Sequence, residues 1–344
     1  MSARRVLVVR TGAMGDVLHA LPAVAALRHR WPEAEIDWAV DPRWAPLLVD
    51  EAGRGPVVSR VHPAETKEWS RKPFSWTTAR SVMDLRKALD AGRYQHVVDV
   101  QGTLRSAVIG RLAGAEDLVG FADPREGAAR LLYTRTLERQ GAHVVEQNAA
   151  LLGGALGEHL EPMAAALPLW PSAEDWADRA FGDFSIRGRI ALLAPTAGWG
   201  AKQWPAERFG ALAAALAERG FEVLVNAATM QDEVGMAVVR ASQGRARLVC
   251  CDVAQLGALT RRAAVVVGGD SGPVHLAAAL GVPVVALFGP TDPERNGPWG
   301  MGPKRVLRDP VSVTTYKRSG EVEVGLGRIE VEAVLAAVEE LLQA

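Results

Sequence analysis

The sequence predicts an α/β protein built from two similar halves, each with a parallel, doubly wound sheet. Short apolar runs of strand length alternate with longer segments of helical periodicity, which is typical of βαβ units. This pattern starts twice, because the apolar runs 6–9 and 189–194 are each followed by a glycine-containing loop and a helical segment. Two domains of this kind commonly bury a ligand in the cleft between them, so we expect a binding site there.

Composition limits the class of protein. The chain has 344 residues, enough for two domains with substantial cores. Its 39 Lys and Arg residues against 40 Asp and Glu give no global argument for nucleic-acid binding. Cys250 and Cys251 are adjacent, which disfavours a disulfide or a metal cluster and suits a reducing cytoplasm. No apolar run is long enough for a signal peptide or a membrane span, so we expect a cytoplasmic protein that at most rests on a membrane surface.

The first half alternates strands and helices. The expected strands are 6–9, 35–40 and 94–100, and the expected helices begin at Asp16 and cover 104–112 and 143–156. The basic and aromatic segment 67–76 contains Pro73 and is expected to be a loop or an irregular crossing. Three prolines between residues 160 and 171 interrupt the pattern and predict a linker.

The second half repeats this order. The expected strands are 189–194, 221–225, 263–269 and 283–289. The expected helices are 205–219 and an amphipathic one at 329–342, and residues 270–280 are expected to be a loop that leads into a helix.

The loop from Arg10 to Asp16 joins the first strand to the first helix. Gly12 and Gly15 permit backbone conformations that other residues resist. Asp16 stands where a helix N-cap is expected, and Asp is a common capping residue. The end of the first strand in an open α/β sheet is also where such folds place their chemistry. From this loop alone, Asp16 is either a helix cap or a functional carboxylate.

A second glycine loop, 268–275, opens a helix and predicts an anion site. Backbone N–H groups at a helix N-terminus favour a group such as a diphosphate, and the Ser271 hydroxyl adds a donor. Asp270 would repel phosphate if it pointed the same way, so it should accept hydrogen bonds from sugar or ribose hydroxyls or orient the loop. His275, one turn into the helix, either reaches the ligand or is structural. Lys202 either neutralises a phosphate or is an ordinary solvated lysine.

Other ligand classes lack their motifs. There is no G-x-G-x-x-G loop after the first strand with an acid about twenty residues on, and no G-x-x-x-x-G-K-[ST] loop, so nicotinamide enzymes and P-loop NTPases are disfavoured. The seven histidines are scattered and no D-x-D pair occurs, so the sequence gives no basis for a metal site.

Five motifs together resemble the ADP-heptose:lipopolysaccharide heptosyltransferases, glycosyltransferase family 9. They span almost the whole chain, at residues 10–22, 99–102, 202–205, 269–276 and 288–293. Within the family, they are most similar to the type I branch, which adds the first heptose to Kdo2-lipid A.

The resemblance implies a GT-B fold with two facing Rossmann-like domains. Residues 1–160 would form the acceptor domain, 161–171 the linker and 172–325 the nucleotide-sugar domain. The last helix, within 326–344, would pack back on the first domain. The implied enzyme is an inverting glycosyltransferase that moves heptose from ADP-heptose to a Kdo residue, with no metal or further cofactor. It would work in the cytoplasm as a peripheral protein at the inner face of the membrane, without a nucleic-acid partner.

The resemblance also implies roles for residues. Asp16 matches the general base, and Lys202 matches the lysine beside the diphosphate. The implied donor-binding residues are Thr196, Lys202, Gln231, Asp270, Ser271, Gly272, His275 and Thr291. The implied acceptor-binding residues are Gly12, Met14, Gly15, Lys67, Arg71, Lys72 and Arg125. For the basic segment, a solvated charged loop is the alternative interpretation.

Alternative functions stay open at this point. Within the transferases, the chain could be a heptosyltransferase II or another surface-glycan enzyme. In a different class, it could be a nucleotide-sugar epimerase or a protein that only binds a nucleotide sugar. Product analysis separates these classes, because only a transferase consumes acceptor and releases ADP.

Overall fold

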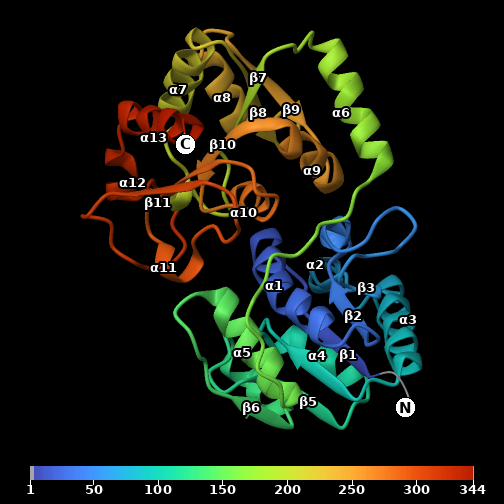
Figure 1. The fold of residues 1–344 in the computed structure, drawn as a ribbon. Coiled ribbons are helices and arrows are strands. Elements are labelled where there is room, and N and C mark those ends of the chain that lie inside the picture. The colour runs from blue at the N-terminus through green and yellow to red at the C-terminus, as the bar shows by residue number, and fades with distance from the viewer. Residues whose placement is uncertain (1–3, 344) are drawn as a thin grey trace. The chain divides into compact units, whose positions relative to one another are not determined.

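The structure is a computed structural model that describes residues 4–343 (Figure 1). The chain divides into a first unit, Met1–Pro168, and a second unit, Leu169–Ala344. The division falls inside the segment expected to link the halves. Each unit contains one six-stranded sheet in which all pairs are parallel, so the predicted pair of doubly wound α/β units is confirmed.

The first sheet has the strand order β3-β2-β1-β4-β5-β6. Its strands are β1 (Arg5–Val9), β2 (Glu35–Val40), β3 (Arg60–Pro63), β4 (His96–Asp99), β5 (Asp117–Phe121) and β6 (Arg135–Leu137). Its helices are α1 (Met14–Arg30), α2 (Thr66–Arg71), α3 (Trp76–Gly92), α4 (Leu104–Leu112) and α5 (Val144–Leu156), with 3-10 turns η1 (Pro42–Leu47) and η2 (Gly127–Leu132). The central strand β1 is apolar over consecutive residues because helices cover both faces of a parallel sheet.

The second sheet has the order β12-β11-β10-β7-β8-β9. Its strands are β7 (Arg189–Ala194), β8 (Phe221–Ala227), β9 (Ala246–Cys250), β10 (Ala263–Gly269), β11 (Val284–Phe288) and β12 (Lys304–Arg308). Its helices are α6 (Pro171–Asp183), α7 (Ala206–Glu218), α8 (Glu233–Ala241), α9 (Val253–Arg262), α10 (Gly272–Ala279), α11 (Pro293–Asn296), α12 (Val324–Arg328) and α13 (Val331–Gln343), with a 3-10 turn η3 (Gly200–Lys202).

Both sheets have the same topology. Numbered within its own unit, each sheet has the order 3-2-1-4-5-6 of dinucleotide-binding folds. The direction of winding reverses between β1 and β4 in the first unit and between β7 and β10 in the second. The crevice at the carboxyl ends of these strand pairs is where open α/β sheets bind their ligands.

The C-terminal helix requires a correction. We expected it to pack back on the first domain, but α13 packs on the second unit, against α7, β10, β11 and β12. Its apolar stripe explains this, because Val334, Val338 and Leu341 are buried in the same core as Leu212 and Leu216 of α7.

The segment 67–76 also differs from its prediction. Residues 66–71 form the helix α2, and α3 begins at Trp76, so only the short turn between the two helices is irregular. Pro73 lies in that turn, where its missing N–H group breaks no helical hydrogen bond. Among the described helices, none combines the length and the apolar character needed to cross a membrane.

Candidate active site

The predicted site residues form two groups, one in each unit, and the central residues of each group lie where the strand winding reverses. In the first unit, Asp16 follows β1, and the loop 99–103 follows β4. In the second unit, Lys202 follows β7, and Asp270 follows β10. Because the carboxyl ends of parallel strands meet at one edge of a sheet, each unit brings its own group together.

Asp16 is not the N-cap of α1. The helix begins at Met14 with Ala13 as its N-cap, so Asp16 is the third residue of the first turn. Its Oδ2 accepts a hydrogen bond of 3.0 Å from the backbone N–H of Ala13. The carboxylate therefore still satisfies a backbone donor at the helix start, but from inside the helix.

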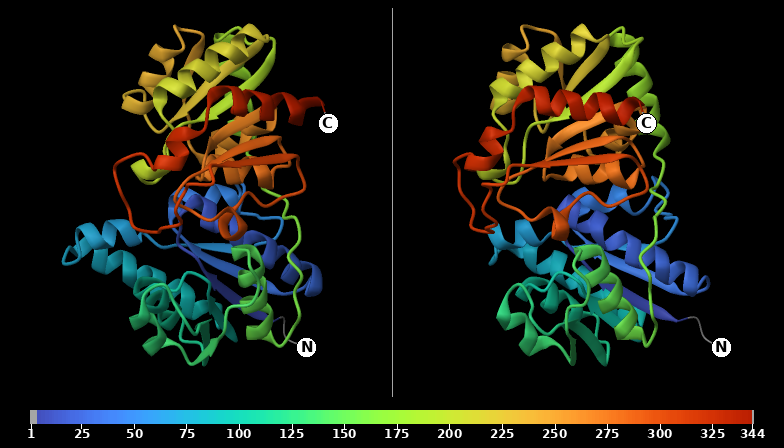
Figure 2. Two further views of the ribbon diagram at one scale, coloured as in Figure 1. Left: turned by 90° about the vertical axis from the view of Figure 1, so that its left-hand side faces the viewer. Right: turned by 60° about the vertical axis from the view of Figure 1, so that its left-hand side comes forward.

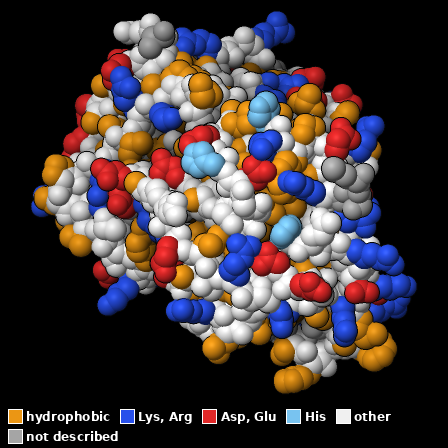
Figure 3. Space-filling view, turned by 60° about the horizontal axis from the view of Figure 1, so that its bottom comes forward, with side chains coloured by type: hydrophobic (Ala, Val, Ile, Leu, Met, Phe, Trp, Pro, Cys, Tyr) orange, Lys and Arg blue, Asp and Glu red, His pale blue; other side chains and the backbone are white. Residues whose placement is uncertain are grey.

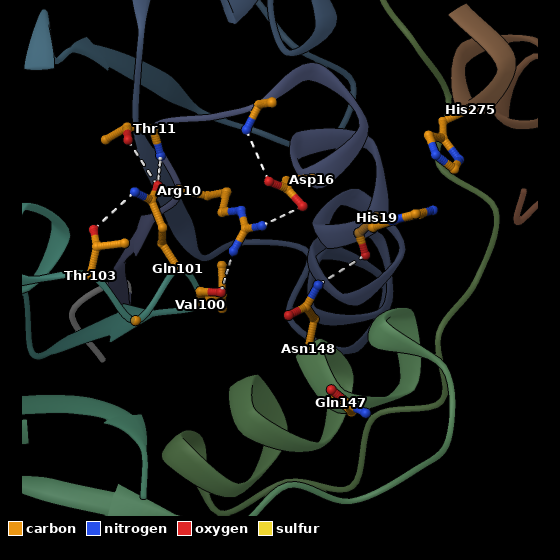
Figure 4. A network of polar contacts seen from close by, with 12 residues as sticks. Arg10, Thr11, Asp16, His19, Val100, Gln101, Thr103, Gln147, Asn148 and His275 are labelled. Carbon is orange, nitrogen blue, oxygen red and sulfur yellow. Dashed lines mark hydrogen bonds and ion pairs between the residues drawn. The ribbon is translucent and has the colours of Figure 1, made fainter. Parts of the chain in front are cut away.

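Arg10 holds the other oxygen of this carboxylate (Figure 4). Its Nη2 lies 2.7 Å from Asp16 Oδ1, and its Nη1 donates a 2.7 Å hydrogen bond to the carbonyl of Val100. The Arg10 side chain is nearly buried, whereas the Asp16 side chain is 36% exposed. A fixed guanidinium thus orients a carboxylate that remains accessible to a substrate.

Gln101 ties the two loops together. Its Oε1 accepts hydrogen bonds from the backbone N–H of Thr11, at 2.7 Å, and from the Thr11 hydroxyl, at 2.8 Å. Its Nε2 donates to Thr103 Oγ1 at 3.0 Å. The loop after β4 therefore fixes the backbone that leads from β1 to Asp16.

Asp99, the last residue of β4, anchors the loop that follows this strand. It is fully buried and accepts hydrogen bonds from the backbone N–H groups of Gln101 and Gly102 and from the hydroxyls of Ser106 and Tyr133. Burial raises the pKa of Asp99 above its ordinary value, since these four neutral donors only partly compensate for lost hydration.

Three further acceptor-binding candidates, Gly12, Met14 and Gly15, lie in the loop after β1 and the first turn of α1. Gly12 has φ +153°, and a Cβ added there would lie 2.8 Å from Trp44 Nε1, so the chain approaches this indole too closely for another residue. Met14 is buried, so its side chain belongs to the core. Gly15 is half-buried in the first turn of α1.

The basic acceptor candidates lie at the same edge of the first sheet. Lys67 and Arg71 are exposed on α2, which follows β3, and Lys72 follows directly and pairs with Glu68 at 3.3 Å. Arg125 is exposed in the loop after β5, where its backbone passes Gly102. All four cations thus follow strands whose carboxyl ends share the edge of Asp16.

Lys202 and Asp270 form the centre of the second group. Lys202 Nζ lies 2.5 Å from Asp270 Oδ2, and the Asp270 side chain is 7% exposed. Thr291 Oγ1 donates to the same oxygen at 2.8 Å, and His275 Nε2 lies 2.9 Å from Asp270 Oδ1. Both carboxylate oxygens of Asp270 are therefore engaged by neighbouring side chains.

The ionisation of Asp270 follows from these partners. Burial by itself favours the neutral acid, but the hydrogen bonds and charges of His275 and Lys202 outweigh it and hold the pKa of Asp270 well below its ordinary value. The buried carboxylate in turn keeps the Lys202 ammonium in one position. A positioned ammonium in a loop before a helix is suited to a diphosphate.

The other donor candidates surround this pair. Ser271 is the N-cap of α10, and its Oγ is buried without a hydrogen-bond partner among the described residues. Gly272 begins α10, so backbone N–H groups of its first turn lie beside Asp270. Thr196 is half-buried in the loop after β7, and Gln231 is exposed just before α8. Within residues 4–343, no group of three or more His, Cys, Asp or Glu side chains is arranged to hold a metal.

The structure adds Arg10, Thr11 and Gln101 to the predicted site. All three stand in motifs that the sequence singles out, at 10–22 and 99–102, but 90 residues separate Arg10 from its partner Val100 and Thr11 from its partner Gln101, which hides these contacts in the sequence. The sequence signal that could have identified them is that each is a polar residue just after the end of a central strand.

Known proteins match most of the chain. The sequence profile of glycosyltransferase family 9 (heptosyltransferase) matches residues 82–315. Lipopolysaccharide heptosyltransferase 1 of Escherichia coli K12 is 31% identical over 89% of this chain and 94% of its own length. The protein of the same name from Pseudomonas aeruginosa is 30% identical over 86% of this chain and 81% of its own length. Lipopolysaccharide heptosyltransferase 3 of Escherichia coli, at 26% identity, covers 95% of this chain and 96% of its own length.

Solved structures agree with the sequence relatives. E. coli heptosyltransferase WaaC with ADP superposes with a TM-score of 0.78 at 26% identity, over 98% of this chain and 99% of that chain. WaaC with ADP-2-deoxy-2-fluoro heptose gives a TM-score of 0.76 at the same identity and coverage. The fold is thus of the predicted GT-B class, and the chain is a glycosyltransferase that belongs to glycosyltransferase family 9, the heptosyltransferases.

Proposed function

We propose that the chain transfers heptose from ADP-heptose to a Kdo residue of the lipopolysaccharide inner core, in Kdo2-lipid A. The observation that carries this proposal is the ion pair between the half-buried Lys202 and the buried Asp270, beside the start of α10. It offers a fixed positive charge and helix N-terminal donors to a diphosphate. The similar WaaC structures that contain ADP and a fluorinated ADP-heptose support a donor of this kind.

The proposed reaction is a single displacement with inversion. An acceptor hydroxyl oxygen bonds to the anomeric carbon of heptose while the bond from that carbon to the diphosphate oxygen breaks. Asp16 accepts the hydroxyl proton, a role that its accessible carboxylate and its fixed orientation by Arg10 support. ADP leaves with the electron pair of the broken bond.

The departing diphosphate gains negative charge, which Lys202 and the first turn of α10 would stabilise. Asp270 and Thr291 would act by positioning Lys202 rather than by touching the donor, because their polar atoms already bond to each other and to the lysine. In this proposal, protein groups supply the compensating charge, and no metal ion or further cofactor takes part.

The acceptor would bind at the edge of the first sheet. Lys67, Arg71, Lys72 and Arg125 are exposed there and would pair with the carboxylate of Kdo and the phosphates of lipid A. Since this acceptor is a glycolipid, we propose that the protein works peripherally at the inner face of the cytoplasmic membrane.

The test is incubation with ADP-heptose and purified Kdo2-lipid A, followed by mass spectrometry and ADP detection. We expect one heptose added per acceptor and one ADP released. Transfer only to an acceptor that already carries heptose would instead assign the type II reaction. A donor that isomerises without acceptor, or that only binds and raises the melting temperature, would refute transfer.

A further inference from the structure

The turn between α2 and α3 exposes large hydrophobic side chains. Phe74 is 101% exposed and Trp76 is 81% exposed. Met83 lies two turns along α3 from Trp76, on the same side of the helix, and is 65% exposed. The opposite side of α3 is the one that packs inward, through Leu85 and Leu89. The three exposed side chains therefore form an apolar tip that the first unit leaves uncovered.

The apolar tip projects from the first unit. In the left-hand view of Figure 2, the light-blue helices around residue 70 extend beyond the rest of that unit. Hydrogen bonds fix this geometry. Ser75 Oγ accepts from the backbone N–H of Thr78 at 3.1 Å, and Thr78 Oγ1 donates to the carbonyl of Lys72 at 2.8 Å. The aromatic rings are thus held outward by a structured turn.

Positive charge surrounds the apolar tip. Residues 67–87 contain six Lys and Arg against two Asp and Glu, although the whole chain has a net charge of −1. All six cations are exposed; they are Lys67, Arg71, Lys72, Arg80, Arg86 and Lys87. The space-filling view shows hydrophobic side chains beside Lys and Arg side chains at its lower right margin (Figure 3).

The position of the tip relates it to the acceptor site. The helix α2 and the start of α3 follow β3, so they lie at the carboxyl edge of the sheet, where Asp16 also lies. On α2, Ser70 accepts a 2.8 Å hydrogen bond from Arg105 of α4, which begins at the same edge. A surface that covered the tip would therefore face the edge where the acceptor is proposed to bind.

We propose that the apolar tip, Phe74, Trp76 and Met83, inserts into the interfacial region of an anionic lipid bilayer while Arg80, Arg86 and Lys87 bind its headgroups, beside the acceptor-binding cations Lys67, Arg71 and Lys72. Trp favours the depth where acyl chains meet headgroups, and clustered Lys and Arg bind anionic lipid surfaces. Charge complementarity selects this occupant, because an apolar protein partner would not need six cations around three hydrophobic side chains. The inference rests on the proposed function in one respect, namely that the acceptor is embedded in the same bilayer.

The test is co-sedimentation of the full chain with phosphatidylcholine vesicles, with and without about a third of phosphatidylglycerol. We expect binding to the anionic vesicles, with an affinity at least about tenfold weaker for the double variant Phe74→Ser/Trp76→Ser. The matched control is Met301→Ser, because Met301 is 87% exposed in the second unit; it should bind like the wild type. Equal binding by the double variant, or equal binding to neutral vesicles, would overturn the proposal.

A second measurement separates docking from folding and from transfer. With a soluble, deacylated acceptor, kcat/KM of the double variant should match the wild type, whereas with acceptor embedded in vesicles it should fall about tenfold. A wild type that binds no vesicles overturns the docking proposal even if it transfers heptose. Vesicle binding without transfer by the wild type would instead refute the proposed function and leave docking in place.

Discussion

The two units share one strand order but place an aspartate at the winding reversal in different surroundings, after the first strand in the first unit and after the fourth strand in the second. The Asp16 side chain of the first unit is 36% exposed and pairs with the cation of Arg10. Asp270 of the second unit is 7% exposed and is engaged by Lys202, His275 and Thr291. The difference teaches that the crevice at a winding reversal can hold an accessible carboxylate after one of its two strands, or a buried carboxylate that fixes a cation after the other.

A second comparison concerns two buried aspartates, Asp99 with neutral hydrogen-bond donors and Asp270 with charged partners. Asp99 and Asp270 both lose water, which by itself favours the neutral acid. Burial raises the pKa of Asp99, whose described hydrogen-bond donors are neutral, whereas His275 and Lys202 outweigh burial and lower the pKa of Asp270. Partner charge, rather than burial, decides which aspartate stays ionised at acid pH.

The largest expected effect comes from removing the accessible carboxylate. Asp16→Asn keeps the shape and the contact with the Ala13 N–H group but removes the proposed base, so kcat should fall about 10²- to 10⁴-fold with little change in KM. Steady-state kinetics with the acceptor in excess measures this. A melting temperature close to wild type is the control, and turnover within a factor of about two of wild type would rule out the role.

Lys202 tests the second group. Lys202→Ala should lower kcat about 10²- to 10³-fold and weaken ADP binding, measured by calorimetry, because the diphosphate loses its cation. The substitution also leaves Asp270 buried without this charge, at a cost of about 3–5 kcal/mol in stability. Lys202→Met/Asp270→Asn removes both charges and is the control: it should recover stability but not ADP affinity. Recovery of ADP binding in the double variant would contradict the role of Lys202.

The fold was predictable because its signals are local. Continuous apolar strands and the glycine loops after β1 and β10 specify a parallel α/β sheet from short windows of sequence. The predictions for the start of α1 and for the segment of α2 are wrong for a local reason as well. A carboxylate can cap a helix from its third position, and a six-residue helix makes fewer than two turns, too few for a repeating apolar pattern. The docking of α13 depends on which distant apolar face it meets, which periodicity does not specify.

The sequence names the residues of the candidate site but not the contacts between them. Asp16, Lys202 and Asp270 stand out as charged residues in glycine loops at strand ends. The pairing of Lys202 with Asp270 joins residues 68 positions apart, and that of Arg10 with Val100 joins residues 90 apart. Such pairs follow only from the order of the strands, because that order decides which loops are neighbours.

Acid titration should distinguish the two buried carboxylates. A lowered pKa means that Asp270 stabilises the fold above its unfolded pKa of about 3.9 and that this contribution is lost as the pH falls through the folded value. The stability deficit of Asp270→Asn should therefore be largest near neutral pH and shrink in acid. The contribution of Asp99 to stability depends on pH in the opposite direction. Because its pKa is raised in the folded state, the wild type loses stability as the pH rises from about 4 through the folded pKa.

The deficit of Asp99→Asn should accordingly shrink as the pH rises. Melting temperatures of wild type and both variants between about pH 3 and pH 8 measure this. If the stability deficits of the two variants changed with pH in the same direction, the opposite pKa shifts of Asp270 and Asp99 would be contradicted.

The smallest expected effect is a difference in the loss of stability between two threonine variants, one in each unit. Thr291 Oγ1 donates to the ionised Asp270 at 2.8 Å, and Thr11 Oγ1 donates to the neutral amide of Gln101 at the same distance, and both threonines are buried. Hydrogen bonds to charged groups are worth about 1.5–3 kcal/mol, and neutral ones about 0.5–1.5 kcal/mol. Urea unfolding should therefore show a larger loss of stability for Thr291→Val than for Thr11→Val. Equal losses would mean that neighbouring charge adds nothing to the hydrogen bond of Thr291, and the contrast between the units would then rest on Lys202 and His275 alone.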